Sequence, residues 1–597
     1  MKKLTLALAV NAILASAVQA EEQVETITVT ATRAAQQTSP ILATQIVIGR
    51  AEIALAEVES LPELLSRYAG IDVSQNGGRG QTASVFIRGA SSDQTLVLIN
   101  GLRVNTASNG AATWSTISPE SIERIEIVKG PRAAVWGSDA IGGVINIITR
   151  KHVPGKVTLN AKYGTNNTQS YYVGTGIAHG DGATTVAINH ESSDGFDVLK
   201  TQEPDEDGYD NLSVLVNGSQ NVSDDLTVTW LLRASEQDTD FDSTYLNRAE
   251  NKTREWSLGA NYQWLASDVA NTTVVTLGST RDTSLSFGNG REQANGDLFE
   301  TRRDQLSVAN TTVVNPALSV VLGTDQYEEK VASTTAFAET SRHVQGYFGH
   351  ALFAQNAVTA ELALRYDDVE NIDSETTYNA SVGYQFNDQW LVSAAVGSGF
   401  KAPTFNDLYF PFGGNPDLLS ETSDTEELTV QYQRDAWDVA VSWYNTDIIN
   451  LIEWAPDANG IWQPRNIASA EIKGVDFTAN YAGFGGKHTF NYGYLDAANG
   501  NTGARLVRRA KNQFSYQFMA NFGDTDLLLN YEYKGSRTDS GQYLASYQLV
   551  DMSVNHHFND DLSGQFKLQN VFNQDYETVF NYQALGRAVY FGLTYQL

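Results

Sequence analysis

The fold is decided by three stretches of the chain, GIDVSQNGGRGQTASVFIRG (70–89), TLVLINGLRVN (95–105) and IERIEIVKGPRAAVWGSDAIGGVINIITR (122–150). They contain three short apolar runs, Val85–Ile87, Leu96–Ile99 and Val144–Ile148, which alternate with glycine-rich turns. That pattern predicts short β-strands. The stretch from Leu64 to Arg150 is therefore predicted to form a compact β-rich unit. Because a much longer series of strands follows it, we expect a plug inside a wide barrel.

From Lys156 onward, apolar and polar residues alternate to the end of the chain. In the last segment Val589, Phe591, Leu593, Tyr595 and Leu597 share one face. One apolar and one polar face, repeated along many segments, is typical of a transmembrane β-barrel. About 440 residues at roughly 20 per strand and loop predict an antiparallel barrel of about 22 strands, a size class known to hold a plug. The predicted fold class is thus an all-β membrane protein with an N-terminal α+β plug domain in the lumen. The alternative, an array of periplasmic β-sandwiches, is disfavoured because the apolar face shows no break into domain-sized blocks.

The composition excludes several classes of protein. The chain has 597 residues, with 40 Lys and Arg against 70 Asp and Glu, and a net charge of -30. A nucleic-acid-binding protein would carry a basic surface instead. There is no Cys, which excludes disulfides, thiolate metal sites and a Cys nucleophile. Neither a G-x-S-x-G nor an H-E-x-x-H motif is present, so we expect no enzyme.

The N-terminal sequence shows how the first part of the chain is divided. Residues 1–20 have two lysines, an apolar region and a Val-Gln-Ala end, the pattern of a signal peptide. The alternative is a membrane anchor, for which the apolar run is shorter than the ~20 residues required. We assign 21–33 to an N-terminal recognition segment, 34–152 to the plug domain and 153–597 to the barrel.

Two stretches of the plug leave alternatives open. Thr26 to Thr30 are all β-branched, which suits either an edge strand added to another protein's sheet or simply the first strand of the plug. Ala51 to Tyr68 has the apolar spacing of a helix, which Pro62 is expected to break into two pieces. Gly77 to Gly80 lacks the spacing of a dinucleotide-binding motif. It predicts a flexible loop apex that lets a ligand approach the backbone, or else a plain hairpin turn.

Several motifs together resemble those of TonB-dependent outer-membrane receptors. They are ETITVTATR (25–33), DVSQNGGRGQTASVFIRG (72–89), VKGPRAAVWGSDAIGGVINIITR (128–150), GFKAPTFNDLY (399–409), LVRRAKNQ (506–513) and NVFNQDYETVFNYQALGR (570–587). The GPR…WGSDAIGGVINI element is typical of the whole family. LVRRAK and DYETVFNYQ…GR resemble the branch that imports vitamin B12. The resemblance covers essentially the whole mature chain.

The resemblance implies active import of cobalamin and other corrinoids across the bacterial outer membrane. TonB, with ExbB and ExbD, would supply the energy of the inner-membrane proton-motive force. The receptor would be a monomer surrounded by outer-membrane lipid and lipopolysaccharide. A periplasmic B12-binding protein would receive the cargo from it. Two alternatives remain, a TonB-dependent siderophore receptor and, from another class, a passive porin or adhesin.

The resemblance also assigns roles to the N-terminus and to the plug. The TonB box would comprise Glu25, Thr26, Ile27, Thr28, Val29, Thr30, Ala31 and Thr32. Two plug arginines, Arg88 and Arg132, would need carboxylate partners inside a barrel, because an unpaired buried charge is costly. By resemblance these partners are Glu427 and Asp476, the latter one methylene shorter than the Glu expected from the family. The alternative is that these four are ordinary charges of the lumen.

Acidic residues gather in two predicted hairpin loops. From the pattern alone they form either solvated loops or a calcium site, since calcium takes about six to eight oxygen ligands. The resemblance favours one or two calcium ions that order the loops before the cargo binds. The residues at the family's ligand positions are Asp197, Glu203, Asp205, Asp207, Phe241, Asp242 and Asn247, with Glu250 as an alternative for the last. Phe241 stands where the family has a Tyr.

A cobalamin site should be wide and rich in hydrogen-bonding groups, because the ligand carries many amides. By position, the expected contacts are Asn76, Thr82, Ser84, Ser91, Asn109 and Gly110 on the plug, and Arg508 and Tyr543 on the barrel loops. The alternative for Arg508 is a charge of the lumen beside Arg509.

Overall fold

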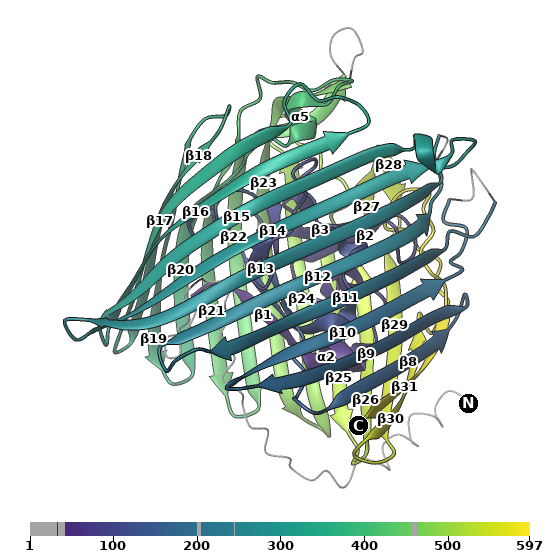
Figure 1. Cartoon of the computed structure of the whole chain (residues 1–597), viewed down its shortest axis with the longest axis horizontal. Helices are drawn as coiled ribbons and strands as arrows, with labels where there is room; N and C mark the ends of the chain where they lie inside the picture. Colours follow the sequence, from purple (N-terminus) through teal and green to yellow (C-terminus); the bar gives the residue numbers. More distant parts are fainter. Residues whose placement is uncertain (1–32, 34–41, 200–203, 244, 457–461) are drawn as a thin grey trace.

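The computed structural model describes residue 33 and residues 42–199, 204–243, 245–456 and 462–597. The predicted signal peptide, the segment from Glu25 to Thr32 and Glu203 lie outside these described residues. Within them, the chain forms a β-barrel that surrounds a smaller N-terminal unit (Figure 1).

The barrel is closed and antiparallel, and it has 22 strands among the described residues, as predicted (Figure 1). The strands are β8 (Val157–Gly164), β9 (Thr168–His179), β10 (Gly182–Ser193), β11 (Tyr209–Asn221), β12 (Leu226–Asp240), β13 (Arg248–Ala266), β14 (Val269–Phe287), β15 (Asp297–Asn315), β16 (Leu318–Ser333), β17 (Ser341–Gln355), β18 (Val358–Val369), β19 (Glu375–Asn387), β20 (Trp390–Lys401), β21 (Glu421–Arg434), β22 (Trp437–Pro456), β23 (Trp462–Gly483), β24 (Gly486–Asn499), β25 (Asn512–Asn521), β26 (Thr525–Lys534), β29 (Tyr547–His557), β30 (Leu562–Gln569) and β31 (Ala588–Gln596).

Closure depends on the pairing of β31 with β8, in which Phe591 lies opposite Tyr163. Because lipid offers no hydrogen bonds to an open edge, a sheet can span a membrane only as a closed barrel. One end of the barrel has short turns, such as residues 180–181. The other has long loops, such as 402–420, which contains α5 (Phe405–Tyr409). Long loops mark the extracellular end of such barrels.

The alternation along β31 separates a lipid face from a lumen face. Phe591 and Leu593 are 58% and 56% exposed, whereas Tyr590 is 2% exposed. The apolar face predicted from the sequence is therefore the outer surface. None of the helices among the described residues has the length and apolar character that a membrane-crossing helix requires.

The plug has a five-stranded sheet with the strand order β1-β6-β7-β4-β5 and a separate hairpin of β2 and β3. Its elements are β1 (Gln45–Gly49), α2 (Arg50–Ala56), α3 (Leu61–Leu65), β2 (Ile71–Gln75), β3 (Ala83–Ile87), η2 (Ser92–Gln94), β4 (Thr95–Ile99), β5 (Leu102–Arg103), η3 (Trp114–Thr116), η4 (Pro119–Ser121), β6 (Ile122–Lys129), α4 (Ala133–Trp136) and β7 (Gly143–Thr149). Ile125, Ile127 and Ile145 are fully buried in its core, which continues onto barrel residues such as Leu215.

The helical stretch forms two pieces, as predicted, but Pro62 does not cause the break. The first helix, α2, ends at Ala56, and the next residue, Glu57, has a left-handed conformation with φ of 50°. Pro62 lies in the first turn of α3, after Ser60, whose side chain caps that helix. Proline is well tolerated there, because the first turn has no intrahelical partner for its missing N–H.

Candidate functional site

The Arg88 guanidinium is the centre of a buried ion-pair cluster between plug and barrel. It donates to both carboxylate oxygens of Glu427 on β21, each at 3.0 Å, and to Asp476 on β23 at 3.1 Å. The ring of Tyr444 lies 4.3 Å from the guanidinium. Burial lowers the pKa of Arg88, but the two carboxylates outweigh it and raise that pKa above its usual value. The shorter Asp476 still reaches Arg88 directly.

Arg132 does not share these carboxylates. Its guanidinium lies 3.3 Å from Glu361 on β18, a partner that the sequence analysis did not name. The second cation on Asp476 is instead Lys129, at 3.1 Å. The predicted direct ion pair of Arg132 with Glu427 or Asp476 is therefore replaced by one with Glu361, although the charge of Arg132 still acts on Glu427. We call Arg88, Lys129, Arg132 and their three carboxylates the lock cluster.

Three of the predicted calcium ligands lie together at the extracellular end. Oxygen atoms of Asp197, Asp207 and Asp242 lie within 4.8 Å of one another, and two of the three residues are buried. Two backbone N–H groups hold two of these carboxylates, Val198 to Asp207 and Leu199 to Asp242, each at 2.9 Å. Burial raises the pKa of Asp207 to about 7, and the neighbouring carboxylates add to that shift.

The other predicted ligands are placed differently. Asp205 is exposed and outside the cluster of three carboxylates. Phe241 and Asn247 pair through their backbones, with the N–H of Phe241 2.9 Å from the Asn247 carbonyl. Glu250 pairs with Lys252 at 3.5 Å and is not among the three clustered carboxylates.

The acidic loop after β10 is packed tightly by the plug and by the last loop. Gly195 has φ of 74°, and any side chain there would collide with the backbone of Asp207. A side chain at Gly77 would similarly collide with Val198. Gln583 of the last loop donates to the carbonyl of Asp197 at 2.9 Å. The predicted loop apex of the plug thus lies directly against the acidic cluster.

The predicted cargo contacts on the plug come from three loops at the same end. Asn76, Thr82 and Ser84 lie on the β2–β3 hairpin, where Asn76 donates to the Thr82 carbonyl at 3.0 Å. Ser91 precedes η2 and forms a capping box with Gln94. Asn109 is exposed and Gly110 is buried. A side chain at Gly110 would lie 2.9 Å from Asp93, so the second and third loops are adjacent.

The two predicted barrel contacts differ in their exposure to solvent and in their bonding partners. Tyr543 is 69% exposed at the tip of the small hairpin of β27 (Arg537–Asp539) and β28 (Gln542–Leu544). Arg508 forms an ion pair with Asp539 of the same hairpin, at 2.9 Å. Its neighbour Arg509 is buried and donates to Ser91 at 3.1 Å. Burial lowers the pKa of Arg509 to about 10.

Three residues that join the barrel or its loops to the plug were not predicted from the sequence. Thr578 of the last loop both donates to and accepts from the backbone of Gln75, at 2.9 and 3.0 Å. Arg509 links the loop after β24 to Ser91, and Glu361 binds Arg132. Arg509 was flagged only as a neighbouring charge. Nothing in the pattern around Thr578 or Glu361 marks either as a partner of the plug.

A plug joined by buried ion pairs to a closed 22-strand barrel defines a gated receptor of the outer membrane. The chain belongs to the TonB-dependent receptors: residues 153–573 match the family "TonB dependent receptor-like, beta-barrel", and residues 37–144 match the "TonB-dependent Receptor Plug Domain". This family consists of receptors and transporters rather than enzymes.

Similar proteins of known name span the whole chain. The vitamin B12 transporter BtuB of Photobacterium profundum is 31% identical over 96% of both chains. BtuB of Vibrio cholerae is 32% identical over 100% of both chains. Among solved structures, the siderophore receptor PirA of Acinetobacter baumannii has a TM-score of 0.80 at 18% identity, covering 93% of this chain and 98% of PirA. At that identity the likeness concerns the fold alone.

We predict that Glu427→Gln destabilises the attachment of the plug to the barrel. The change removes one of the two carboxylates that compensate Arg88, and breaking a buried ion pair costs roughly 3–5 kcal/mol. The measurement is the urea concentration at which the plug detaches, followed by plug-specific spin labels. Glu300→Gln is the matched control, because Glu300 pairs with Arg281 at 2.6 Å on the exposed outer surface. Equal midpoints for the two variants would contradict the prediction.

Proposed function

We propose that the protein imports vitamin B12 across the outer membrane in a TonB-dependent manner. The observation that carries this proposal is full-length similarity, at 31–32% identity, to proteins named vitamin B12 transporters. The LVRRAK and DYETVFNYQ motifs support it, because they lie in the two loops that contact the plug surface through Arg509 and Thr578. A siderophore receptor shares the fold and is the alternative outcome.

The chemistry of the plug surface suits an uncharged ligand rich in amides. The predicted contacts carry hydroxyl, amide and backbone groups, which donate and accept hydrogen bonds without bringing charge. The nearby cations are already compensated or buried: Arg508 pairs with Asp539, and Arg509 donates to Gly89 and Ser91. Such a surface favours a corrinoid over a strongly anionic ferric chelate.

We predict that the purified protein binds cyanocobalamin in isothermal calorimetry and that calcium tightens the binding. In cells, its gene should restore cobalamin-dependent growth to a strain without its own B12 receptor. Ferric enterobactin serves as the control ligand and should give no heat. Binding of the ferric chelate without binding of cyanocobalamin would replace the B12 assignment with the siderophore alternative.

Calcium is the second part of the proposal. Three carboxylates in one small space repel one another, and a divalent cation would remove that repulsion. The Oδ1 atom of Asp197 fits such an ion, because it is shielded from solvent and has no hydrogen-bond partner among the described residues. The role proposed for the ion is to order the loops after β10 and β12 over the plug.

We predict that Asp207→Asn weakens calcium binding at least about tenfold, because it removes one charged ligand and leaves the loop's size unchanged. Asp224→Asn, in the short turn before β12, is the control and should leave the affinity unchanged. The measurement is calcium titration by calorimetry in chelator-treated buffer. Indistinguishable affinities for the two variants would remove the calcium assignment.

Energy from TonB is the third part, with ExbB and ExbD delivering the proton-motive force. Strand addition by the segment Glu25 to Thr32 would give TonB a handle on the plug. Arg33, directly after that segment, pairs with Asp325 at 2.9 Å and stacks at 4.0 Å from the Trp136 ring. A pull on the segment would therefore act first on contacts at the wall of the barrel.

We predict that Ile27→Pro abolishes uptake but leaves cyanocobalamin binding intact. Proline removes a backbone donor and fixes φ, which disrupts an added strand. Gln37→Pro lies five residues beyond the end of the box and is the control; this variant should transport normally. Unchanged uptake by Ile27→Pro would refute the assignment of the box.

A further inference from the structure

The motif GFKAPTFNDLY (399–409) forms the junction between β20 and the long extracellular loop 402–420. Lys401 is the last residue of β20, and α5 begins four residues later, at the end of the barrel that carries the long loops (Figure 1). The junction contacts two loops of the plug, residues 89–94 and 106–110, which contain the predicted cargo contacts Ser91, Asn109 and Gly110. We call these two segments the cargo loops.

The Lys401 ammonium group is buried among three carboxylates. Its Nζ atom lies 3.1 Å from Asp93 of the first cargo loop, and 3.9 Å from both Asp407 of α5 and Glu421 of β21. The Lys401 side chain is 1% exposed, whereas the Asp93 side chain is 30% exposed. Because a buried ammonium group is costly without compensating charge, Lys401 holds these carboxylates, and with them the first cargo loop, close to the barrel.

A second connection runs from the barrel to the backbone of Ser91 through one amide side chain. Nε2 of Gln94 donates to Glu421 at 2.6 Å, and Oε1 of the same amide accepts the Ser91 N–H at 2.8 Å. Both ends of the amide are therefore satisfied, one by the barrel and one by the cargo loop. The position of Ser91 thus depends on Glu421, whose charge lies beside Lys401.

The second cargo loop is attached to the same junction through its backbone. The N–H groups of Phe405 and Asn406, at the start of α5, donate to the carbonyls of Ala107 and Ser108 at 3.2 and 3.0 Å. The next two residues of that loop are predicted cargo contacts. The junction therefore holds both cargo loops, one by side chains and one by backbone bonds.

Gly110 brings the two cargo loops together. Its φ of 76° is a conformation that glycine adopts readily and other residues rarely do. A Cβ atom at this position would lie 2.9 Å from Asp93 and 3.4 Å from Thr404 of the junction. The cargo loops and the junction therefore form one closely packed surface.

Lys401 also compensates the charge of the first cargo loop. Asp93 is the only carboxylate among residues 89–94, and it is partly exposed. Among the described residues, Lys401 is the one cation that forms an ion pair with it. Without the ammonium group, the loop would be less firmly held and would present an uncompensated negative charge beside Ser91.

We propose that Lys401 is a positioning residue for cargo binding: acting through Asp93, and through Glu421 and Gln94, it holds the first cargo loop in the arrangement that binds the cargo. This inference rests on the import function proposed above. A loop that is already ordered loses less conformational entropy when a ligand binds, so the preorganised loop binds more tightly. Lys401 thus contributes to affinity although its own side chain is buried away from the cargo surface.

The test compares two buried lysines of the barrel that each pair with a carboxylate of the plug. Lys401→Met removes the charge and leaves a side chain of similar length. Lys567→Met is the matched control, because Lys567 is 0% exposed and pairs with Glu63 at 3.0 Å, outside the cargo loops. For the full-length protein, cyanocobalamin affinity is measured by calorimetry with calcium present, and the thermal unfolding midpoint is measured alongside.

Both variants should unfold at a lower temperature, because each leaves a plug carboxylate unpaired. Only Lys401→Met should also weaken cyanocobalamin binding, by about tenfold or more, since the cost of ordering the first cargo loop then falls on the binding step. Lys567→Met should bind like the wild-type protein. Unchanged affinity of Lys401→Met, or equal losses of affinity in both variants, overturns the positioning role.

A second pair of variants tests the same ion pairs from the plug side and does not depend on the folding of Lys401→Met. Asp93→Ala should weaken cyanocobalamin binding, whereas Glu63→Ala, the plug partner of Lys567, should not. Adding Asp93→Ala to Lys401→Met should cause no further loss, because residues that act through one interaction are not additive. Unchanged affinity of Asp93→Ala, or additive losses in the double variant, overturns the inference. Absence of cyanocobalamin binding by the wild-type protein refutes the proposed function itself, and so is distinguishable from failure of the positioning role.

Discussion

The pairing of β31 with β8 is the constraint on which the rest of the structure depends. A closed sheet leaves no backbone edge in the lipid, but it also fixes the width of the lumen. A lumen bounded by 22 strands is too wide for its own side chains to fill, so another part of the chain must fill it. The plug does this with a core that extends beyond its own sheet, since Tyr172, Leu215 and Leu231 of the barrel pack with plug isoleucines.

In a closed barrel each charged group of the plug faces one particular strand, so its ion-pair partner depends on how the plug is oriented. The lumen face of the barrel carries charged side chains on several strands, and many of them pair with charged groups of the plug. Plug cations face barrel carboxylates in the lock cluster, as Arg88 does with Glu427. Ion pairs of the opposite sense occur as well, since Glu63 and Asp72 of the plug pair with Lys567 and Lys534 of the barrel. A plug rotated in the barrel would place like charges together, so this arrangement defines one orientation.

Features that repeat along the chain were predictable from the sequence, whereas features that join distant residues were not. The period of two, the approximate strand number and the outward face of β31 all follow from local alternation. The position of Glu361 opposite Arg132 depends on the register of many successive strands, and the two residues lie 229 positions apart. Resemblance supplied Glu427 as a partner of Arg88, but it assigned Arg132 to carboxylates that other cations occupy. The expectation that Pro62 breaks a helix is wrong because proline disrupts only the interior of a helix, and Pro62 lies in the first turn of α3.

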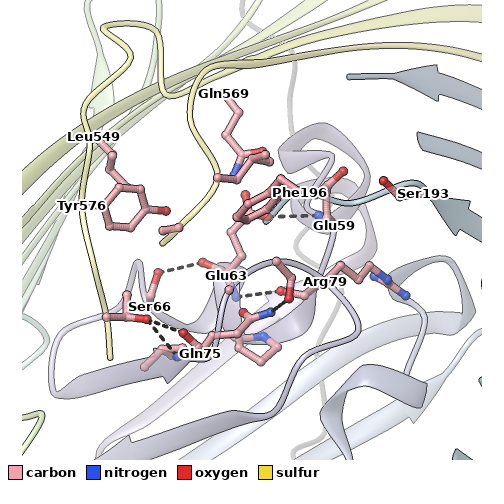
Figure 2. Close-up of a pocket in the computed structure, with 18 of the residues that line it drawn as sticks. Glu59, Glu63, Ser66, Gln75, Arg79, Ser193, Phe196, Leu549, Gln569 and Tyr576 are labelled. Atoms are coloured by element: carbon pink, nitrogen blue, oxygen red, sulfur yellow. Dashed lines mark hydrogen bonds between the residues drawn. The ribbon is translucent and has the colours of Figure 1, made fainter. Parts of the chain in front are cut away.

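The last loop contacts both the acidic cluster and the plug. Gln583 donates to Asp197 and, through its backbone, to Val198, so it supports the acidic cluster at 2.9 Å in both contacts. Thr578, five residues earlier, is bonded to Gln75 at the foot of the plug's loop apex. Tyr576 lines a polar cavity between the plug and the barrel (Figure 2). An ion or a ligand that ordered this loop would therefore act on the plug through the bonds between Thr578 and Gln75. Such coupling would need no movement of the barrel strands, because the loop itself spans the distance from the acidic cluster to the plug.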